Sequence, residues 1–316
     1  MSRRLSAVGT ALIVASISQA ACVKQLMVDG QIEATREAAA AFDTIGDFEL
    51  TQAGAASGLT QFEGMLLLAP NNPDALFLLT KGWTGFAWGF IEDDFERAED
   101  AGDRAAADYH KARAVAAYDR AIGYGLQLIT QDAAGFQEAR KSEASLDEWL
   151  VEGFDEQADA QGLFWLGYAW ASRANLLKDD AETVANVYVG AKFLERSVAL
   201  DPSYTHSAAS VVLAAYHARS AMAELDLAKQ MFDQLLVKES NFLLIRLQYA
   251  TRYACAKADG ELYRKLLEEI LAVKDFASDL RLMNTIAQRR ARRWLGEQRM
   301  FDACGIEAPG GSENAT

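Results

Sequence analysis

Proline, cysteine and histidine are scarce in this 316-residue sequence, which contains four, three and three of them. The few prolines, together with abundant Ala, Leu and Glu, predict a chain that is helical almost throughout. Three cysteines cannot build a disulfide-based scaffold. The sequence leaves open whether Cys255 and Cys304 pair with each other. Each proline stands where a helix would end in any case: Pro70, Pro73, Pro202 and Pro309.

Positive charge is also in short supply, because 31 Lys and Arg residues oppose 45 Asp and Glu residues and leave a formal net charge of −14. An acidic surface repels phosphate groups, which argues against nucleic acid and against anionic lipid headgroups as partners. Beyond the N-terminal segment, no apolar run reaches the length of a transmembrane helix. Membrane attachment is therefore expected only through the N-terminus.

Motifs of catalysis and cofactor binding are missing as well. The sequence has no glycine-rich phosphate loop, no G-x-S-x-G and no H-E-x-x-H. His206 and His217 would lie about 16 Å apart on one helix, too far to share a metal ion. The acidic residues around Asp93 and Glu96 lack the alternating order of a calcium-binding loop. We therefore predict a binding protein that is not an enzyme and holds neither cofactor nor metal.

What the sequence does contain begins at the N-terminus. Arg3 and Arg4 precede an apolar run over residues 5–17, which is long enough for a signal peptide and too short for a permanent membrane helix. Small residues then lead directly into Cys22. We predict that residues 1–21 form a signal peptide and that the mature helical domain spans residues 22–305.

Two kinds of processing fit the end of this signal. One is ordinary secretion, with cleavage after Ala20. The other is lipidation of Cys22, because Ala20-Ala21-Cys22 resembles the lipobox of bacterial lipoproteins, although Gln19 stands where that pattern has an aliphatic residue. We favour lipidation of Cys22. The following Val23 is not the Asp that retains lipoproteins in the inner membrane of enteric bacteria, so the outer membrane is the weakly preferred location.

Residues with tetratricopeptide spacing recur along the chain. Such a repeat pairs two antiparallel helices in 34 residues, with small residues where the helices touch, large residues between them and a proline at the end. The residues that match its second helix are Gly58, Phe62, Met65 and Pro70, then Gly190, Leu194, Ser197 and Pro202, then Ala228, Phe232 and Leu235. Three matches at one spacing predict stacked helical hairpins, because a single hairpin cannot bury its own apolar face.

First helices of the repeat also occur. Residues 163–170 follow the pattern W-x2-L-G-x2-Y, with Leu163 and Trp170 at its two ends, and Leu76, Leu79 and Trp83 follow it less closely. Gly167 of this pattern is predicted to lie where two helices approach closely. The fold class expected is all-α: a superhelical stack of degenerate tetratricopeptide-type hairpins.

The spacing is interrupted in several places. Residues 92–103 form an acidic insert between helices expected near 74–91 and 105–129, and we interpret it as a solvated turn. Residues 130–160 contain helical turns with no repeat spacing. A last amphipathic helix over residues 280–300 is expected to cap the stack, and residues 306–316 are predicted to be disordered. The basic side of the last helix, formed by Arg289, Arg290, Arg292 and Arg293, is interpreted as solvated or as pairing with acidic surface in an oligomer.

The aromatic residues supply the candidate binding site. Leu79, Trp83, Phe86 and Phe90 are spaced as one helix face, whereas Trp88 lies off that face between two glycines. Trp88 packs either against the neighbouring hairpin or at a surface for a ligand or partner, since apolar patches rimmed by charge are where partners bind. The same alternatives hold for Trp165 and Tyr168. Our candidate ligand or partner residues are Trp83, Trp88, Trp165 and Tyr168.

These features together resemble a known family. The motifs that carry the resemblance are the export signal ending at Cys22, the degenerate helical repeats, the phrase L-L-A-P-N-N-P-D-A-L over residues 67–76, the aromatic helix that ends in F-I-E-D-D at residues 90–94, and the segment of residues 112–125. They resemble TatT, the T-component lipoproteins of tripartite ATP-independent periplasmic (TRAP) transporters, over about residues 22–305.

The resemblance implies a periplasmic lipoprotein, a homotrimer, that associates with the solute-binding subunit of the transporter and helps deliver a small hydrophobic ligand. The alternative function is a helical-repeat scaffold lipoprotein in cell-envelope or outer-membrane assembly. A groove lined by Trp88, Trp165 and Tyr168 would favour the transport accessory, and a filled core at these residues would favour the scaffold.

Overall fold

The computed structural model describes residues 25–218 and 223–307. All regular structure in these residues is helical, which confirms the all-α prediction. The predicted signal peptide, Cys22 and residues 308–316 lie outside the described residues. Ile306 is buried, so the packed fold extends at least one residue beyond the predicted boundary at 305.

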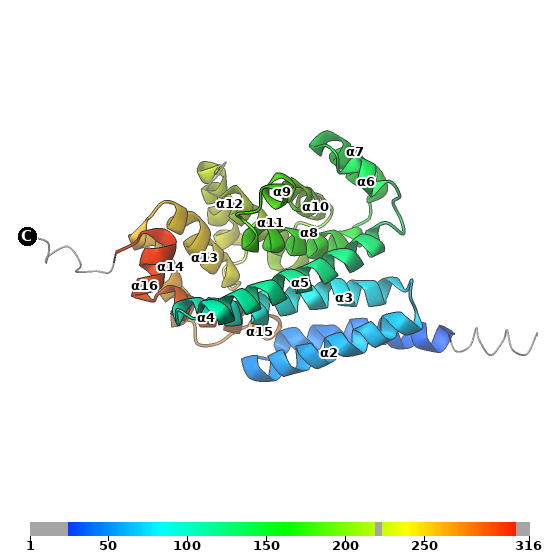
Figure 1. Ribbon diagram of the computed structural model, residues 1–316, viewed down its shortest axis with the longest axis horizontal. Helices are drawn as coiled ribbons and strands as arrows, with labels where there is room; N and C mark the ends of the chain where they lie inside the picture. The colour runs from blue at the N-terminus through cyan, green and yellow to red at the C-terminus, as the bar shows by residue number, and fades with distance from the viewer. Residues whose placement is uncertain (1–24, 219–222, 308–316) are drawn as a thin grey trace, which may run out of the picture.

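The helices follow one another with short connections (Figure 1). A helix over residues 25–38 comes first. The elements after it are η1 (Ala39–Thr44), α2 (Phe48–Leu68), α3 (Pro73–Phe86), η2 (Ala87–Ile91), α4 (Glu92–Asp100), α5 (Arg104–Ile129), α6 (Phe136–Ala139), α7 (Glu143–Gly153), α8 (Asp159–Leu176), α9 (Ala181–Ala185), α10 (Val187–Leu200), α11 (Tyr204–His217), α12 (Leu225–Lys238), α13 (Leu244–Gln248), η3 (Tyr249–Ala254), α14 (Gly260–Ala272), η4 (Ser278–Leu280), α15 (Arg281–Trp294) and α16 (Glu297–Cys304).

Side-chain caps set where several of these helices begin. The Asn72 side chain accepts a hydrogen bond from the backbone N–H of Ala75, and Pro73 occupies the first turn of α3. Asp47 and Asp103 cap α2 and α5 in the same way. Such caps satisfy backbone donors that have no partner inside the helix. Polar residues in the connections therefore fix the lengths of the hairpin arms.

Helices that are neighbours in the sequence pack on one another, as stacked hairpins require. Helix α3 packs on α2 and α5, α8 packs on α5 and α10, and α11 packs on α10 and α12. The long helix α5 runs along the middle of the molecule (Figure 1). This arrangement is consistent with the predicted stack of tetratricopeptide-type hairpins.

Gly167 lies at a close contact between two helices, as predicted. A Cβ atom added at Gly167 would lie 2.8 Å from Leu194 Cγ and 2.9 Å from the carbonyl oxygen of Gly190. Helices α8 and α10 can approach this closely only because both positions lack a side chain.

Gly167→Leu should lower the free energy of unfolding by about 1–3 kcal/mol or more, because overpacking forces side chains and backbone apart. Urea denaturation measures the change. Gly123→Leu is the matched control, since Gly123 lies on exposed α5 surface with nothing within 4 Å of an added Cβ. Equal stability of the two variants would contradict a close contact at Gly167.

Residues 130–160 form a small second core beside the main one. Phe136, Leu146 and Leu150 are buried there, and Trp149 packs against them. The helical turns predicted in this segment are therefore present, as α6 and α7. They project from the top of the molecule, where α7 packs on α10 (Figure 1).

The C-terminal segment differs from the prediction of one capping helix over residues 280–300. Helix α15 ends at Trp294, and α16 begins at Glu297 after a break at Leu295 and Gly296. Besides α13 and α14, α15 packs on η1 and α2 near the start of the chain. The hydroxyl of Thr285 donates a hydrogen bond to the carbonyl oxygen of Gly46. The last long helix therefore closes the two ends of the stack against each other.

Candidate functional site

The structure brings together three of the four aromatic residues predicted as a binding site. The ring centroids of Trp88 and Tyr168 are 6.2 Å apart, and those of Trp165 and Tyr168 are also 6.2 Å apart. Phe164 joins them, 4.8 Å from Trp165. We call these four residues, from η2 and α8, the aromatic cluster. All four are buried, so the aromatic cluster contacts no outside protein surface in this conformation.

Trp83, the fourth predicted residue, lies in a different environment. It is partly exposed, and its Nε1–H donates to Glu63 of α2 at 2.9 Å. Arg120 of α5 stacks over the Trp83 ring at 5.2 Å and pairs with the same carboxylate at 2.8 Å. Burial alone would raise the pKa of Glu63, but hydrogen bonds from Tyr124, Arg120 and Trp83 together hold it below its ordinary value. Trp83 is thus the accessible member of the predicted set.

A π-helical turn explains why Trp88 is buried although α-helical periodicity places it off the core face. Residues Ala87–Ile91 form η2, a π-helix between α3 and α4, and all five of them are buried. A π-turn holds one extra residue and shifts the register of the side chains that follow. Trp88 and Phe90 therefore both point inward. Such turns occur frequently at functional sites.

Charged and polar groups lie beside the aromatic cluster. The guanidinium of Arg290, on α15, stacks over the Trp88 ring at 4.5 Å and donates to the Trp88 carbonyl oxygen. It also pairs with Glu92 at 3.4 Å, and Glu92 accepts a hydrogen bond from the Tyr118 hydroxyl. Burial raises the pKa of Glu92 even though Arg290 and Tyr118 oppose the shift. One carboxylate and one guanidinium are thus held inside the apolar core.

Two buried polar atoms at this site have no hydrogen-bond partner among the described residues. They are the Tyr168 hydroxyl and Nε of Arg290. Burial, together with the nearby Glu92, raises the pKa of Tyr168 well above its ordinary value, so its hydroxyl keeps its proton and can donate. Unpartnered buried donors are costly and require an explanation. A bound molecule with a polar acceptor group would supply the missing partner.

Arg252 of η3, the second π-helical turn, adds a positive charge near these groups. It is half-buried, and its partners in the described structure are the neutral side chains of Asn175 at 2.9 Å and Gln248 at 3.3 Å. Burial lowers the pKa of Arg252, while the charge of Glu92 raises it. Sequence analysis missed Arg252, Glu92 and Tyr118 because no motif links residues so far apart in the chain.

Comparison with known protein families decides the assignment. The sequence model of the TRAP transporter T-component family matches residues 45–301, most of the described structure. The chain belongs to this family. No curated protein matches the sequence.

In this T-component, the acidic insert is a buried structural element and not the solvated turn that the sequence suggested. Residues 92–100 form α4, and Glu92, Asp93 and Glu96 are buried. Arg293 of α15 pairs with both Asp93 and Glu96. Further pairs are Arg289 with Asp93 at 2.9 Å, Arg293 with Asp100 at 3.6 Å, Arg299 with Glu99 at 3.3 Å, and Arg299 with Asp100 at 2.6 Å.

We call these pairs between α4 and the C-terminal helices the acid–arginine ladder. It corrects the interpretation of the arginine run as a solvated face or an oligomer contact, since Arg289, Arg290 and Arg293 pair with acids of the same chain. Arg292 alone of the run is exposed. Burial of the carboxylates requires such pairing.

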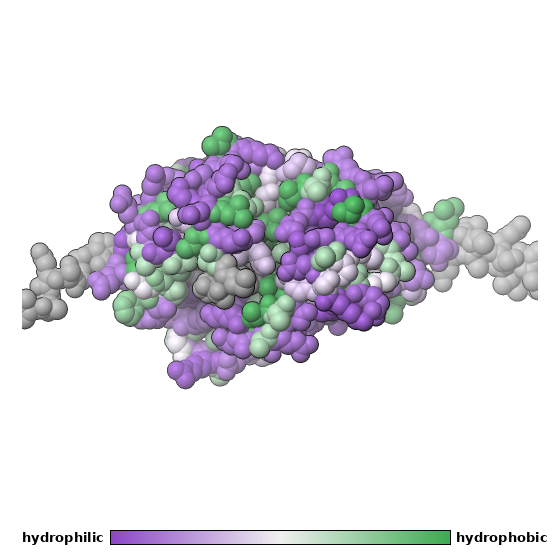
Figure 2. All heavy atoms as spheres, turned by 90° about the horizontal axis from the view of Figure 1, so that it is seen from above, coloured by the Kyte–Doolittle hydropathy of each residue, from purple (hydrophilic) through white to green (hydrophobic). Residues whose placement is uncertain are grey.

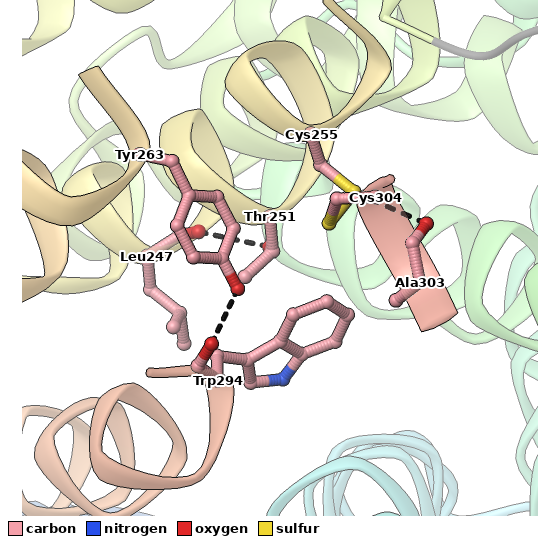
Figure 3. The surroundings of a disulfide bond; sticks show 7 residues. All are labelled: Leu247, Thr251, Cys255, Tyr263, Trp294, Ala303 and Cys304. Atoms are coloured by element: carbon pink, nitrogen blue, oxygen red, sulfur yellow. Dashed lines mark hydrogen bonds between the residues drawn. A yellow bond between two sulfur atoms is a disulfide. The ribbon is translucent and has the colours of Figure 1, made fainter. Parts of the chain in front are cut away.

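A disulfide bond joins α16 of the T-component to the helical turn that follows η3. Cys255 and Cys304, with Cα atoms 4.7 Å apart, are linked 49 residues apart in the sequence (Figure 3). The Tyr263 hydroxyl donates to the carbonyl oxygen of Trp294 nearby, which holds α14 to the end of α15. The pairing that the sequence left open is therefore present.

Neither metal ligands nor membrane helices are found in the described residues. No three side chains of His, Cys, Asp or Glu come together there to hold a metal ion. His206 instead contacts Asp279 at 3.2 Å, and His217 contacts Glu224 at 2.6 Å. No helix among the described residues is long and apolar enough to cross a bilayer.

Proposed function

We propose that this protein is an exported accessory of a TRAP-type transporter that binds the solute-binding subunit and a small hydrophobic ligand. The observation that carries the transport role is the family match over residues 45–301. The unpartnered hydroxyl of Tyr168 in the aromatic cluster and the unpartnered Nε of Arg290 beside it support the ligand. Because the cluster is buried, ligand and protein partner must contact different parts of the molecule.

The proposed location is the periplasm, with a lipid on Cys22 and the outer membrane as the weakly preferred side. The Cys255–Cys304 disulfide supports export, because disulfides form and persist in oxidising compartments and are rare in the cytosol. The lipid would attach three residues before the first described residue, Gln25. We retain the homotrimer as part of the proposal, on the family resemblance.

The ligand that fits the aromatic cluster is a small apolar molecule with one acceptor group. Its apolar part would contact Trp88, Trp165 and Phe164, and its acceptor group would accept hydrogen bonds from the Tyr168 hydroxyl and from the N–H of Arg290 Nε. Ligand sites of proteins commonly combine an aromatic lining with a few placed polar groups.

The surface around Trp83 is the proposed contact for the solute-binding subunit. Trp83, Arg120 and Tyr124 come together on α3 and α5, joined by hydrogen bonds to Glu63. Trp, Tyr and Arg are the residue types that contribute most binding energy in protein interfaces. Arg120 is about half exposed, so this group is accessible to a partner.

Trp83→Ala should weaken binding to the purified solute-binding subunit by about 30-fold, which corresponds to the 2 kcal/mol of an interface hot spot. Calorimetry or surface plasmon resonance measures the affinity. Tyr109→Ala is the matched control, because Tyr109 is an exposed aromatic residue on α5. Thermal melting of both variants separates lost binding from lost stability. Wild-type affinity in a folded Trp83→Ala protein would contradict this contact, and no binding by wild type would contradict the transport role.

One observation favours the alternative, a scaffold lipoprotein of the cell envelope. Trp88, Trp165 and Tyr168 are buried, as they would be in a filled core that serves only the fold. The transport accessory is proposed to bind a small ligand, whereas the scaffold lipoprotein requires no ligand. Native mass spectrometry of protein purified from its own periplasm distinguishes them, since the transport accessory should carry a small molecule and the scaffold should not.

A further inference from the structure

Four large apolar side chains are exposed at the end of the molecule where the described chain begins. Leu26 and Met27 are 74% and 71% exposed, and Leu67 and Leu68 at the end of α2 are 83% and 59% exposed. We call these four residues the apolar end. They form the largest such group, because the other exposed apolar residues are scattered over α2, α5, α7, α12 and α16.

The packing of the first helix on α2 places Leu26 and Met27 at the same end of the molecule as Leu67 and Leu68. The helix over residues 25–38 lies on the C-terminal part of α2, where Ile32 and Val28 pack with Met65 and Leu66. The Asn72 side chain donates to Asp29 at 2.8 Å, which ties the turn after α2 to the same helix. Hydrophobic atoms are visible at this end beside the grey trace, on a face that is otherwise mostly hydrophilic (Figure 2).

Apart from Asp29 in the first helix, the segments packed around the apolar end contribute uncharged polar groups, although the chain has a net charge of −14. Residues 64–73 and 121–131, which form the α2–α3 turn and the end of α5, contain no Asp, Glu, Lys or Arg. The amides of Gln127 and Gln131 donate to the carbonyl oxygens of Pro70 and Asn71, each at 3.1 Å. A surface with so few charges is suited to an apolar neighbour and not to an electrostatic one.

The distance from the predicted lipid determines what that neighbour is. Cys22 precedes Gln25 by three residues, and a fully extended chain spans at most about 3.6 Å per residue, or roughly 11 Å in all. A lipid on Cys22 would therefore hold Leu26 and Met27 within or next to the headgroup layer. Apolar side chains at that depth become buried in the boundary between headgroups and acyl chains.

We propose that the apolar end is a bilayer-contact surface, which holds the protein upright on a membrane of zwitterionic lipid. This inference rests on the lipid anchor of the proposed function and adds a second contact to it. The apolar end and α16 lie at opposite ends of the long axis (Figure 1). Helix α16 and its disulfide would accordingly lie farthest from the membrane, and the side of the molecule that carries Trp83 would face the periplasm.

The test uses the mature chain with Cys22→Ser, so that no lipid contributes to binding. We expect this protein to float with phosphatidylcholine vesicles in a density gradient, and high salt should not release it. Leu67→Glu together with Leu68→Glu should lower the partition coefficient at least tenfold. The matched control is Val151→Glu with Val237→Glu, which changes two exposed apolar residues on α7 and α12 and should leave flotation unchanged.

The flotation experiment would overturn the proposal in any of three ways: the unlipidated chain fails to float with the vesicles, the control pair loses as much flotation as the Leu67 and Leu68 variant, or high salt releases the protein from the vesicles. Light scattering provides the other decisive measurement: if the Leu67 and Leu68 variant converts an oligomer into a monomer, the apolar end is an interface between copies of the chain. A failure of the lipid anchor itself would appear elsewhere, as wild-type protein in the soluble fraction of cells.

Discussion

Arg293→Met should lower the free energy of unfolding by about 3–5 kcal/mol, which is the cost of leaving a buried ion pair with one partner removed. The side chain of Arg293 is only 8% exposed and pairs with both Asp93 and Glu96. Methionine keeps most of the side-chain volume, so the loss reports mainly on the uncompensated carboxylates. Urea denaturation at low and high salt measures it, and the loss should persist at high salt because buried charges are weakly screened.

The neighbouring residue provides the control. Arg292 is exposed, and Arg292→Met should change stability by no more than about 0.5 kcal/mol. Adding Glu96→Gln to Arg293→Met should recover part of the loss, since it removes one of the stranded charges. Similar stability of the Arg292 and Arg293 variants would mean that the acid–arginine ladder does not hold α4 to α15.

Trp88→Ala should also cost about 3–5 kcal/mol, as is usual when a buried aromatic side chain is truncated. The substitution removes the indole ring, which contacts Tyr168 and over which Arg290 stacks. Chemical denaturation measures the loss. Trp83→Ala is the comparison, and it should cost less because Trp83 is partly exposed.

A second substitution at Trp88 tests ligand binding. Trp88→Phe should keep most of the stability and still change the quenching of intrinsic fluorescence when a hydrophobic ligand binds at the aromatic cluster. If Trp88→Ala leaves the melting temperature unchanged, Trp88 does not occupy the core position that the structure gives it. If Trp88→Phe behaves like wild type with every ligand, the aromatic cluster serves the fold and not ligand binding.

Much of the fold was predictable, because repeat spacing reports on contacts between neighbouring helices. The small residue at Gly167 and the spacing around Leu194 and Phe232 belong to helices that lie next to each other in the sequence. These contacts leave a local signature of small and large residues. The helices of residues 130–160 were also predictable from their own apolar periodicity.

The acid–arginine ladder was not predicted, because charge runs usually lie on solvated faces. Its members are close to 200 residues apart, so no local pattern shows that they meet. One signal is present in hindsight: Glu92, Asp93 and Glu96 have the same spacing as Arg289, Arg290 and Arg293. Two helices with matched spacing of opposite charges can pair along their length.

The location of Trp88 was left open by the sequence for a different reason. Periodicity of 3.6 residues per turn was assumed throughout, and a π-helical turn breaks it. The five consecutive apolar or glycine residues of η2 were the available signal, since a continuous run of this kind is buried on every side. Trp88, Trp165 and Tyr168 lie near one another in the structure, and their role as a ligand site stays a prediction.

The contact of α15 with η1 and α2 has a consequence for how the chain folds. Thr285 and Gly46 are 239 residues apart, so the first helices lack part of their packing surface until the last tenth of the chain is available. Open repeat arrays nucleate locally and grow repeat by repeat, whereas contacts so distant in sequence slow folding and make it cooperative. A chain that crosses a membrane N-terminus first would therefore emerge incomplete. It would reach its native state only once α15 has followed.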